Sequence, residues 1–600
     1  MVYIRKHARL LAILCVMMAA VAMPYMIPEN PDNPVFRSGI LSFLLLAACL
    51  PPLESAFQKA GKRQLIVSMI FGFFFAFALS LGSELYIYQG LLRGFGSMIR
   101  RMAVPVLAAP FIGGFCALAS TASPTAGKAQ RFHLPFAAYM AVIFLCWVPV
   151  WLAFWPANIR FDFTGEYAQH LENAYSSLHP LLHSVIQNNI ITLGEVLVDR
   201  TFGLALLTFA QMLCLSAALA ACCTFIQRRT FSCLPALLIA LFFGLHPVFS
   251  VLAVSTTKDT MFAAATTALA LMTWQLLEEP DAFFASRRKY ICFIMITVLT
   301  ALLRNNGLFA LILALPGMII AAKGFRRKAF LLSAAGTVAS IALFSLLSAV
   351  YHCESMPSRQ LYSLPAQQLV RAYNLSDALT PEDKEEIRSW YLSDDGLVLL
   401  PQLADPAKGY LDEDMLQEKG SGAYLKLWAS HLDDSLHEYI EALLMLNLGS
   451  WYPDDLTHAM IYPEQAWNGQ GYLSLSVPET TEQGFTMTCH IPAVRRIIER
   501  ICSANRYQRI PLISATFSPA VAFWMIALAC TILIAKKRAN LLPASLGAWG
   551  LWLSYLMGPC TLPRYALPLF ILAPVLLIAA LYIPTERSDA HVDPVDSQIQ

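Results

Sequence analysis

The chain has 600 residues, of which 57% are hydrophobic and only 14% are charged, with a formal net charge of +2 at pH 7. Soluble domains carry about 25% charged residues and about 45–50% apolar residues, so the apolar excess of this chain has to face lipid. A nearly neutral chain also argues against a nucleic-acid partner, which would require a basic face. Composition therefore predicts a polytopic protein embedded in the lipid bilayer.

Apolar runs recur along the chain at lengths suited to membrane crossing, since a bilayer core needs about 20 apolar residues in a helix. We predict an all-α polytopic protein with about 14 transmembrane helices, near residues 10–27, 38–53, 64–82, 102–120, 133–154, 201–225, 232–253, 260–278, 290–303, 307–322, 329–350, 514–534, 541–557 and 565–583. Two of them, 290–303 and 307–322, are short and meet at LRNNG, which predicts a broken pair that turns back near the outer surface. The first run follows basic residues but precedes no small-residue cleavage site, so we expect it to be retained as a span.

Basic clusters predict the orientation, because Lys and Arg are retained in the cytoplasm. They fall on one side if every run crosses once: Arg5-Lys6, Lys59/Lys62/Arg63, Lys128/Arg131, Arg228-Arg229, Arg287-Arg288-Lys289, Arg326-Arg327-Lys328 and Lys536-Lys537-Arg538. Arg93, Arg100 and Arg101 are the exception, because they fall outside. Either they cap an amphipathic helix or bind an anionic headgroup, or one of the early spans is wrongly assigned. We expect a multi-pass protein of the cell membrane with both termini in the cytoplasm.

Four regions follow from this reading. Residues 1–350 form a transmembrane catalytic module with its first large external loop at 155–200, and residues 351–512 form a mixed extracytoplasmic domain between the eleventh and twelfth spans. Residues 513–584 are C-terminal transmembrane helices, and residues 585–600 are a cytoplasmic tail expected to be disordered. Most of the 14 cysteines lie in apolar runs as small hydrophobes; one disulfide could form among Cys353, Cys489 and Cys502.

Two acids open the most chemically suggestive stretch, NIRFDFTGEYAQHLENAYSSLHPLLHS, which follows the fifth run. Asp162 and Glu166 are four residues apart and share one face if the stretch is helical. Partial desolvation at the membrane surface is expected to raise the pKa of a carboxyl here, which suits proton abstraction from a hydroxyl. The alternative is a pair of solvated acids on an interfacial helix.

Two histidines, His179 and His183, follow in the same stretch, with Pro180 suited to a helix start. Histidine could bind a metal, donate to a phosphate or lie at the interface. Two histidines with Asp162 and Glu166 would also make a site for a divalent cation such as Mg²⁺ or Mn²⁺. The spacing leaves these alternatives open.

Three cationic side chains are predicted on the same outer side. STTKDT places Lys258 and Asp259 between two spans with almost no loop, where charges are usually paired or functional; the alternative is a snorkelling lysine beside a helix-capping Asp. Arg304 interrupts the hydrophobic hairpin at LRNNG, either as a clamp on carbonyls or as a fork for phosphate. Arg564 and Tyr565 lie at the outer mouth of the last span, where Tyr also suits the interface. If they converge, these cations would form a site for a phosphate lipid.

Residues 351–512, which we call the external block, are richer in charged residues and turn formers than the apolar runs. PEDKEEIRSWYLSDDG predicts a capped helix and a turn. WYPDDLTHAMIYPEQAWNGQGYLSLS is aromatic, and its Trp and Tyr residues either stack on sugar rings or build a small core. The sequence contains no nucleotide-phosphate loop, GxSxG elbow or zinc-ligand spacing.

The motifs together resemble the GT-C class of polytopic glycosyltransferases, which take a sugar from a polyprenyl-phosphate donor, and more narrowly a bacterial membrane-protein family. The residues that carry the resemblance are FDFTGEY and SSLHPLLHS, STTKDTMF, PAQQLVRAY at 365–373, and PRYALPLF. It implies a hexosyltransferase-like enzyme that inverts the sugar, with Asp162 as general base, Glu166 assisting or helping to hold a metal, and Lys258 and Arg564 on the donor phosphate. Many members of the class have two acids adjacent or nearly so, whereas here they are four apart, so which acid is the base stays open.

The same resemblance implies the partners: a polyprenyl-phosphate-linked sugar donor, the bilayer, and a cell-envelope glycan or protein as acceptor. A flippase for lipid-linked sugars, or another transporter, is the main alternative. Transporters place ionisable groups near the bilayer midplane and often carry repeated halves, whereas these charged motifs lie at one surface. A lipid or cell-wall acyltransferase and a structural scaffold for an envelope complex are further alternatives.

Overall fold

The computed structural model describes residues 1–26, 40–122, 133–454, 473, 475–476, 481–502 and 512–584. Nearly all regular structure in these ranges is helical. The strands described there are β1 (Thr481–Glu482) and β2 (Phe485–Thr486), which pair antiparallel. The all-α prediction is confirmed; the predicted disordered tail and most of the aromatic stretch after Trp451 lie outside the described residues.

Seven described helices are long and apolar enough to cross a membrane: α2 (Ala8–Met26), α5 (Lys62–Tyr88), α6 (Phe95–Ser120), α7 (Phe136–Ala153), α10 (Arg200–Thr230), α13 (Lys258–Glu278) and α17 (Arg326–Val350). The number becomes eight if α11 (Cys233–Leu245) and α12 (Pro247–Ala253), which are bent by 59°, form one span. Shorter apolar helices are α16 (Gly307–Ala321), α27 (Pro519–Ala535) and α29 (Leu567–Tyr582). The chain is an all-α membrane protein.

The remaining helices outside the external block are shorter or more polar: α1 (Val2–Lys6), α3 (Ile40–Ala48), α4 (Leu50–Lys59), α8 (Phe161–Leu171), α9 (Leu181–Leu197), α14 (Pro280–Phe284), α15 (Arg287–Leu302) and α28 (Pro543–Tyr555). The predicted break at LRNNG is confirmed, because α15 ends at Leu302 and α16 begins at Gly307. A helix lies at each of the predicted apolar runs within the described residues.

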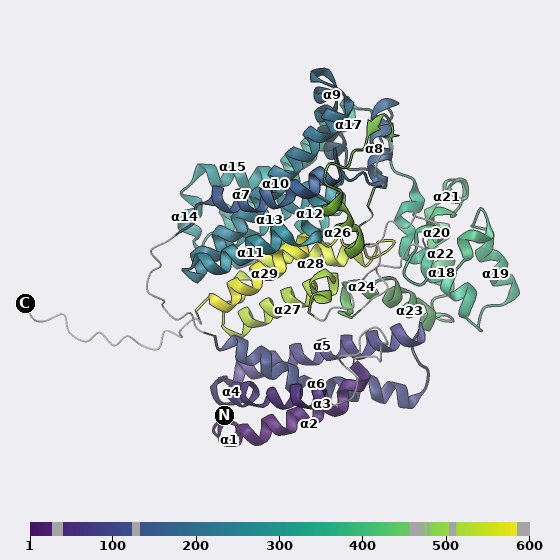
Figure 1. Cartoon of the computed structure of the whole chain (residues 1–600). Coiled ribbons are helices and arrows are strands. Elements are labelled where there is room, and N and C mark those ends of the chain that lie inside the picture. Colours follow the sequence, from purple (N-terminus) through teal and green to yellow (C-terminus); the bar gives the residue numbers. More distant parts are fainter. Residues whose placement is uncertain are drawn as a thin grey trace, which may run out of the picture.

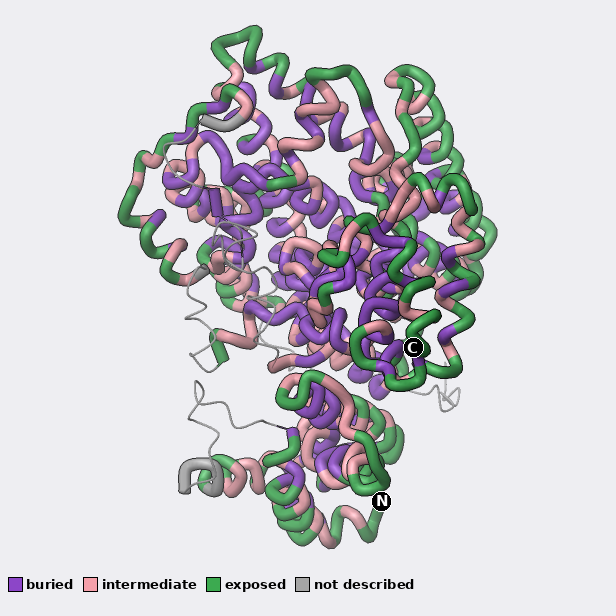
Figure 2. Tube along the Cα trace, turned by 90° about the vertical axis from the view of Figure 1, so that its right-hand side faces the viewer, coloured by how far each residue is buried: buried purple, intermediate pink, exposed green. Residues whose placement is uncertain are grey.

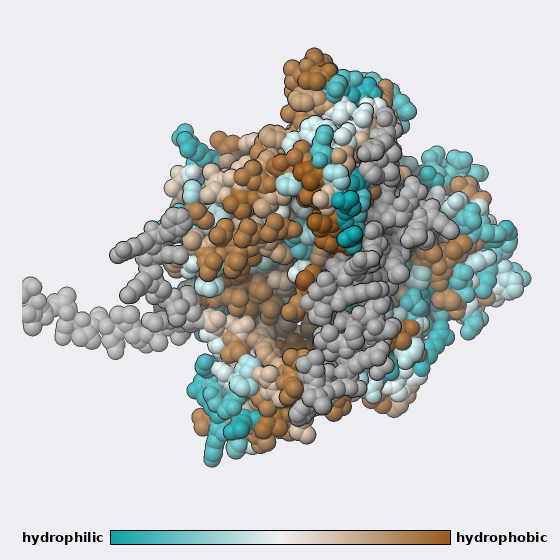
Figure 3. All heavy atoms as spheres, in the orientation of Figure 1, coloured by the Kyte–Doolittle hydropathy of each residue, from teal (hydrophilic) through white to brown (hydrophobic). Residues whose placement is uncertain are grey.

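Helices α1–α6 form a small bundle beside the larger body, as Figures 1 and 2 show from two directions. In the larger body one continuous apolar core joins α7, α10–α13, α15, α16 and α27–α29. Hydrophobic residues cover the face over α7, α10 and α11 in Figure 3, whereas hydrophilic residues gather over the helices of the external block. Hydrophobic and hydrophilic surfaces are therefore separated on this face of the molecule.

In the external block a second, mainly helical unit is built from α18 (Ser363–Leu375), α19 (Pro381–Arg388), α20 (Asp405–Gly409), α21 (Glu413–Lys419), α22 (Ser421–Ser430) and α23 (Leu436–Leu446). The block's other helices contact the larger body: α24 (Leu448–Trp451) packs on α27 and α26 (Pro492–Cys502) packs on α7. The predicted capped helix is confirmed, since Thr380 and Asp383 form a capping box at the start of α19. Trp390, Tyr391 and Tyr424 are buried in a separate apolar core. These aromatic residues stabilise the unit instead of lining its surface.

Arg93, Arg100 and Arg101, the exceptions to the predicted pattern of basic clusters, each have a carboxylate partner. Arg100 and Arg101 lie 3.2 and 2.5 Å from Glu84, and Arg93 lies 2.5 Å from Glu438 on α23. The Arg93–Glu438 pair links the α5–α6 hairpin to the external block, whereas Arg100 and Arg101 join α6 to α5 within the hairpin. Cys353 and Cys489 are free thiols, and the side chain of Cys502 lies outside the described residues.

Candidate functional site

All nine residues predicted as site residues from the sequence converge on one cluster. They come from five places in the chain: α8 (Asp162, Glu166), the start of α9 (His179, His183), the start of α13 (Lys258, Asp259), the α15–α16 turn (Arg304) and the loop before α29 (Arg564, Tyr565). Contacts of 4 Å or less connect residues as far apart in the sequence as Asp162 and Arg564. We call this group the charged cluster.

A short parallel pairing of two loops brings α8 and α13 together. The N–H of Asn158 donates to Val254 O at 2.8 Å, and the N–H of Thr256 donates to Asn158 O at 3.0 Å. The side chain of Asn158 also donates to Ser255 Oγ at 2.8 Å. Because these bonds lie just before each helix begins, they place Asp162 and Lys258 side by side.

Helix α8 then carries both acids to the same side, as the spacing predicted, and Glu166 is buried. Gly165 lies between them, and a Cβ at this position would come within 3.2 Å of His179 Nε2. Pro180 is the N-cap of α9, which confirms the predicted helix start. Thr257, not Asp259, caps α13, because its Oγ1 accepts from the N–H of Asp259.

Asp162 faces two cations. Its Oδ2 accepts a hydrogen bond from Arg564 Nη1 at 2.8 Å and lies 3.2 Å from Lys258 Nζ. The Asp162 side chain is 22% exposed, and those of Lys258 and Arg564 are 12% and 14% exposed. Asp162 is therefore the more exposed of the two acids on α8, since the Glu166 side chain is only 2% exposed.

Glu166 lies deeper, against the two histidines. His183 Nδ1 is 2.8 Å from Glu166 Oε2, and His179 Nδ1 is 3.5 Å from Oε1. Lys258 Nζ reaches both sides of this group, at 3.7 Å from Glu166 Oε1 and 3.3 Å from His179 Nδ1. Lys258 thus bridges the two acids, which explains why a lysine lies where the bilayer would otherwise make it costly.

Asp259 is completely buried and forms a second ion pair, with Arg304. Arg564 Nε lies 3.9 Å from the other oxygen of Asp259. The Tyr565 ring lies between the two arginines, with its centroid 4.5 Å from Arg304 Cζ and 5.0 Å from Arg564 Cζ. Asp259 and Tyr565 therefore orient both guanidinium groups.

The expectation of a raised carboxyl pKa is wrong for both acids. Burial raises the pKa of Asp162, but Arg564 and Lys258 outweigh it and hold that pKa well below its usual value. Burial also raises the pKa of Glu166, but His183, Lys258 and His179 outweigh it and lower that pKa to about 2. Burial and the Lys258 charge lower the pKa of His179. Both acids are ionised carboxylates when no ligand is bound.

Formal charges within the cluster balance. Lys258, Arg304 and Arg564 contribute three positive charges, and Asp162, Glu166 and Asp259 contribute three negative charges when both histidines are neutral. A bound phosphate would make the site net negative unless a proton were taken up.

No group of three or more His, Cys, Asp or Glu side chains in the described ranges is arranged to hold a metal ion. The two carboxylates proposed as metal ligands both contact the Lys258 ammonium. A divalent cation bound to both would compete with that ammonium for the same oxygens.

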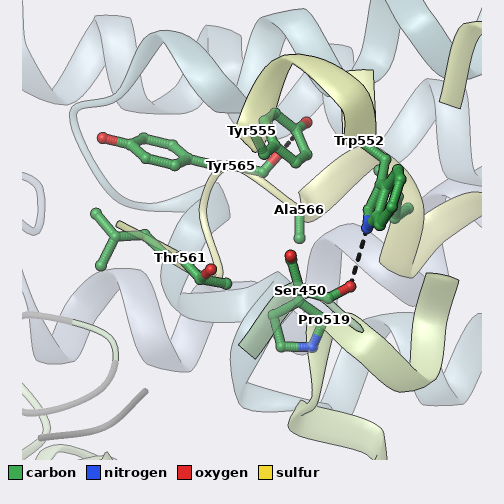
Figure 4. A pocket seen from close by; sticks show the side chains of 9 residues that line it. Ser450, Pro519, Trp552, Tyr555, Thr561, Tyr565 and Ala566 are labelled. Carbon is green, nitrogen blue, oxygen red and sulfur yellow. Dashed lines mark hydrogen bonds between the residues drawn. The ribbon is translucent and has the colours of Figure 1, made fainter. Parts of the chain in front are cut away.

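A small, mainly apolar pocket adjoins the charged cluster at Tyr565 (Figure 4). It is lined by Ser450, Pro519, Trp552, Tyr555, Thr561, Leu562, Tyr565, Ala566 and Leu569. The Trp552 indole N–H donates to Ser450 O at 2.9 Å, and the Tyr555 hydroxyl donates to Tyr565 O. The pocket links the cationic groups to the ends of α24, α27 and α28.

The external block forms backbone hydrogen bonds with two of the loops that carry site residues. These contacts were not predicted from the sequence. Ser177 N donates to Glu354 O at 2.8 Å, close to His179 in sequence. Ala404 N donates to Pro559 O at 2.7 Å, in the loop that leads to Arg564. Asn305 Nδ2 also donates to Ser177 O, at 3.0 Å. Backbone hydrogen bonds between loops do not depend on the type of side chain, so they give no sequence signal.

The fold and the site together define an all-α membrane protein with a buried cluster of paired charges at one end of its helical body. The chain belongs to a family of unknown function, DUF6020, whose match covers residues 171–593. Asp162 and Glu166 lie just before the matched region, and the other seven site residues lie inside it. No curated protein and no solved structure matches the chain significantly.

Proposed function

We propose that the chain is a membrane glycosyltransferase of the GT-C kind, which moves a sugar from a polyprenyl-phosphate donor to an acceptor hydroxyl with inversion. The observation that carries the proposal is the meeting of Lys258, Arg304 and Arg564, from three distant segments, opposite Asp162. Guanidinium forks and an ammonium suit a phosphate, and a neighbouring carboxylate suits a hydroxyl.

In this proposal, Asp162 removes the proton of the acceptor hydroxyl, whose oxygen attacks the anomeric carbon of the sugar. The bond to the donor phosphate breaks, and Arg564 and Lys258 stabilise the charge that develops on the departing phosphate. Asp259, which is paired with Arg304, and Tyr565 hold Arg564 in place. His179, His183 and Glu166 orient Lys258 from the opposite side.

The low pKa of free Asp162 fits this cycle, because the cations that lower it are the ones the donor phosphate would engage. Once they turn to the phosphate, the carboxylate becomes a stronger base. A Mg²⁺ or Mn²⁺ ion at Asp162 and Glu166 is a possible addition, tested by metal titration of the activity.

The proposed topology has about 14 membrane crossings, with both termini in the cytoplasm and residues 351–512 outside. The charged cluster then faces the exterior leaflet, where a cell-envelope glycan or protein would supply the acceptor hydroxyl. The separation of hydrophobic and hydrophilic surfaces supports a location of the hydrophilic helices outside the hydrocarbon core, and the basic clusters support the direction (Figure 3).

The experiment is to incubate purified protein in nanodiscs with a panel of polyprenyl-phosphate sugars and to measure release of polyprenyl phosphate. Asp162→Asn should lower the rate about 10²–10⁴-fold, the range of a lost general base, without loss of folded protein. Glu172→Gln, an exposed acid at the end of the same helix, is the matched control and should keep the rate.

Two results would contradict the proposal in different ways. Full activity of Asp162→Asn would rule out the assigned base, and Glu166→Gln would then test the other acid. Failure of the folded wild-type protein to release polyprenyl phosphate from any donor in the panel would rule out the proposed reaction with those donors.

A further inference from the structure

A cavity of about 350 Å³ opens at the end of the helical body that is opposite to the charged cluster. It lies where α13 and α16 end, and both helices begin at the cluster, beside Lys258 and Arg304. From Lys258 to Leu277, α13 rises about 30 Å, which is the thickness of a bilayer core. Figure 1 shows α14, which follows α13, on the side away from the external block. The cavity therefore lies about one bilayer thickness from the charged cluster.

The side chains around this cavity divide it into an apolar part and a cationic edge. Leu276 in the last turn of α13 and Ala322 at the end of α16 are buried, whereas Lys323, Lys537 and Asn540 are exposed. The lining residues are Leu276, Leu277, Pro280, Ala321, Ala322, Lys323, Lys537, Ala539 and Asn540. An apolar wall beside two ammonium groups suits a ligand that is part hydrocarbon and part anion.

The cations near the cavity are used in two ways. Arg326 is bound to the protein, because its guanidinium donates to Ile320 O at 3.1 and 3.2 Å and caps the end of α16. The side chains of Lys323 and Lys537, in contrast, make no hydrogen bond or ion pair within the described residues. Glu279 is exposed and does not line the cavity. Two ammonium groups at one opening, without a carboxylate partner in the described chain, favour an anionic ligand.

Lys537 also holds a backbone conformation that favours glycine. It follows the end of α27 with a φ of 61°, in the left-handed region. The N–H groups of Lys537 and Arg538 donate to Ile534 O at 3.1 Å and to Leu533 O at 2.8 Å, which is the pattern of a Schellman motif. Glycine adopts this conformation without a steric cost, so a lysine at this position points to a use for its side chain.

The surroundings of the cavity favour a lipid over a small soluble anion. Ile320, next to the lining residue Ala321, is 66% exposed, so hydrocarbon chains have an apolar surface beside the cavity. Lys537 belongs to one of the basic clusters predicted to face the cytoplasm, where the membrane leaflet is anionic. Both observations fit a phospholipid whose chains lie along α16.

We propose that this cavity binds the phosphate group of an anionic phospholipid through Lys323 and Lys537, with the Asn540 amide donating to the rest of the headgroup. Binding here does not depend on sugar transfer and is separate from the donor phosphate at the charged cluster. The ends of α13 and α16 carry partial negative charge, so the two ammonium groups must supply the attraction. At about fivefold per cation near an anionic lipid, removal of both should weaken binding about 30-fold.

Photo-crosslinking of the full chain in nanodiscs tests the site directly. The probe is a phosphatidylglycerol with a diazirine on its glycerol head, present as a minor component in phosphatidylcholine. The wild type should be labelled at residues 276–280 and 321–323, and labelling there should fall about 30-fold in Lys323→Met/Lys537→Met. Arg287→Met/Arg288→Met removes the same charge from exposed positions outside the lining and should keep most of the labelling. Equal losses in the two double variants would overturn the site, since binding would then follow the general charge of this face.

Lys537→Gly separates a ligand-binding lysine from a structural one. In phosphatidylcholine nanodiscs its Tm should equal or exceed that of the wild type, because glycine fits a φ of 61°. Exchange of phosphatidylcholine for phosphatidylglycerol should raise the Tm of the wild type more than that of Lys537→Gly. A lower Tm of Lys537→Gly already in phosphatidylcholine would overturn the proposal, because the ammonium would then bind part of the chain instead of a lipid.

Inorganic phosphate distinguishes a lipid from a soluble anion. Added to the wild type in nanodiscs, it should leave both the Tm and the labelling at residues 321–323 unchanged; a higher Tm with loss of labelling would overturn the lipid assignment. Arg564→Met should keep the labelling, and its loss there would place the bound lipid at the charged cluster instead. With phosphatidylglycerol present the cavity is already filled, so a polyprenyl phosphate added later reports on the charged cluster.

Discussion

Two buried cationic sites lie at opposite ends of α29. Before its first residue, Arg564 and its neighbours form the charged cluster. Beyond its last turn, Lys536 is completely buried and donates to Ala580 O, Leu581 O, Ile583 O and Ala122 O at 2.6–3.1 Å. The first site pairs cations with carboxylates, whereas the second pairs one ammonium with neutral carbonyls.

The difference separates a site that can exchange partners from one that cannot. Carbonyl oxygens at the C-terminus of a helix are satisfied by a single cation, which makes Lys536 a structural clamp. In the charged cluster, each cation has a choice of carboxylates, and an incoming anion can replace one of them. Burial of a cation alone therefore does not indicate function; exchangeable partners around it do.

The largest effect on stability is expected from Arg304→Met. It leaves the fully buried Asp259 without its close cation, and breaking a buried ion pair in this way costs about 3–5 kcal/mol. Unfolding in mixed micelles measures the loss. Arg388→Met removes an exposed ion pair with Asp394 and should cause no measurable change; equal losses in the two variants would show that Asp259 does not depend on Arg304.

The next prediction concerns the binding of an anionic ligand, which should distinguish the charged cluster from the Lys536 site. A polyprenyl phosphate at about one hundred times its Kd would stabilise the folded chain by about 2.7 kcal/mol. The stabilisation should disappear in Arg564→Met and persist in Lys536→Met, since the clamp has no partner that an anion could replace. Thermal unfolding with and without the ligand measures both, and loss of the effect in Lys536→Met alone would reverse the assignment.

Lys536→Met should have a smaller effect on stability, of about 1–3 kcal/mol, because it leaves several carbonyl oxygens without a buried donor. Release of polyprenyl phosphate per folded molecule should be unchanged. Loss of activity in protein that stays fully folded would mean that the Lys536 site also contributes to the reaction.

The pH dependence should be the mildest effect near neutrality. His179 has a lowered pKa when folded, so the unfolded chain binds its proton first, and stability falls slightly as the pH drops through about 6.5. The two carboxylates affect stability at lower pH. The stabilisation by ionised Asp162 and Glu166 is fully present above pH about 4 and is lost as the pH falls toward their lowered pKa values. Tm should thus decline in two stages, and Glu166→Gln should reduce the second.

Individual motifs predicted the site residues, but not how each residue is used. The Lys258-Asp259 pair in STTKDT indicated chemistry near lipid, yet Asp259 is bound to Arg304 and the helix cap is Thr257. The low pKa of Asp162 could not be predicted either, because the cations that cause it lie far along the chain.

The sequence by itself determined that the chain is helical and membrane-embedded, because apolar runs of this length can satisfy their backbone hydrogen bonds in lipid only as helices. It also predicted which charged residues interrupt those runs. Only the tertiary structure decided that Arg564 meets Asp162 across some 400 positions, that the cluster is charge-balanced, and that a clamp of a different kind holds the far end of α29. Pairing between distant segments depends on how the helices pack, and helix packing leaves no local pattern in the residues that meet.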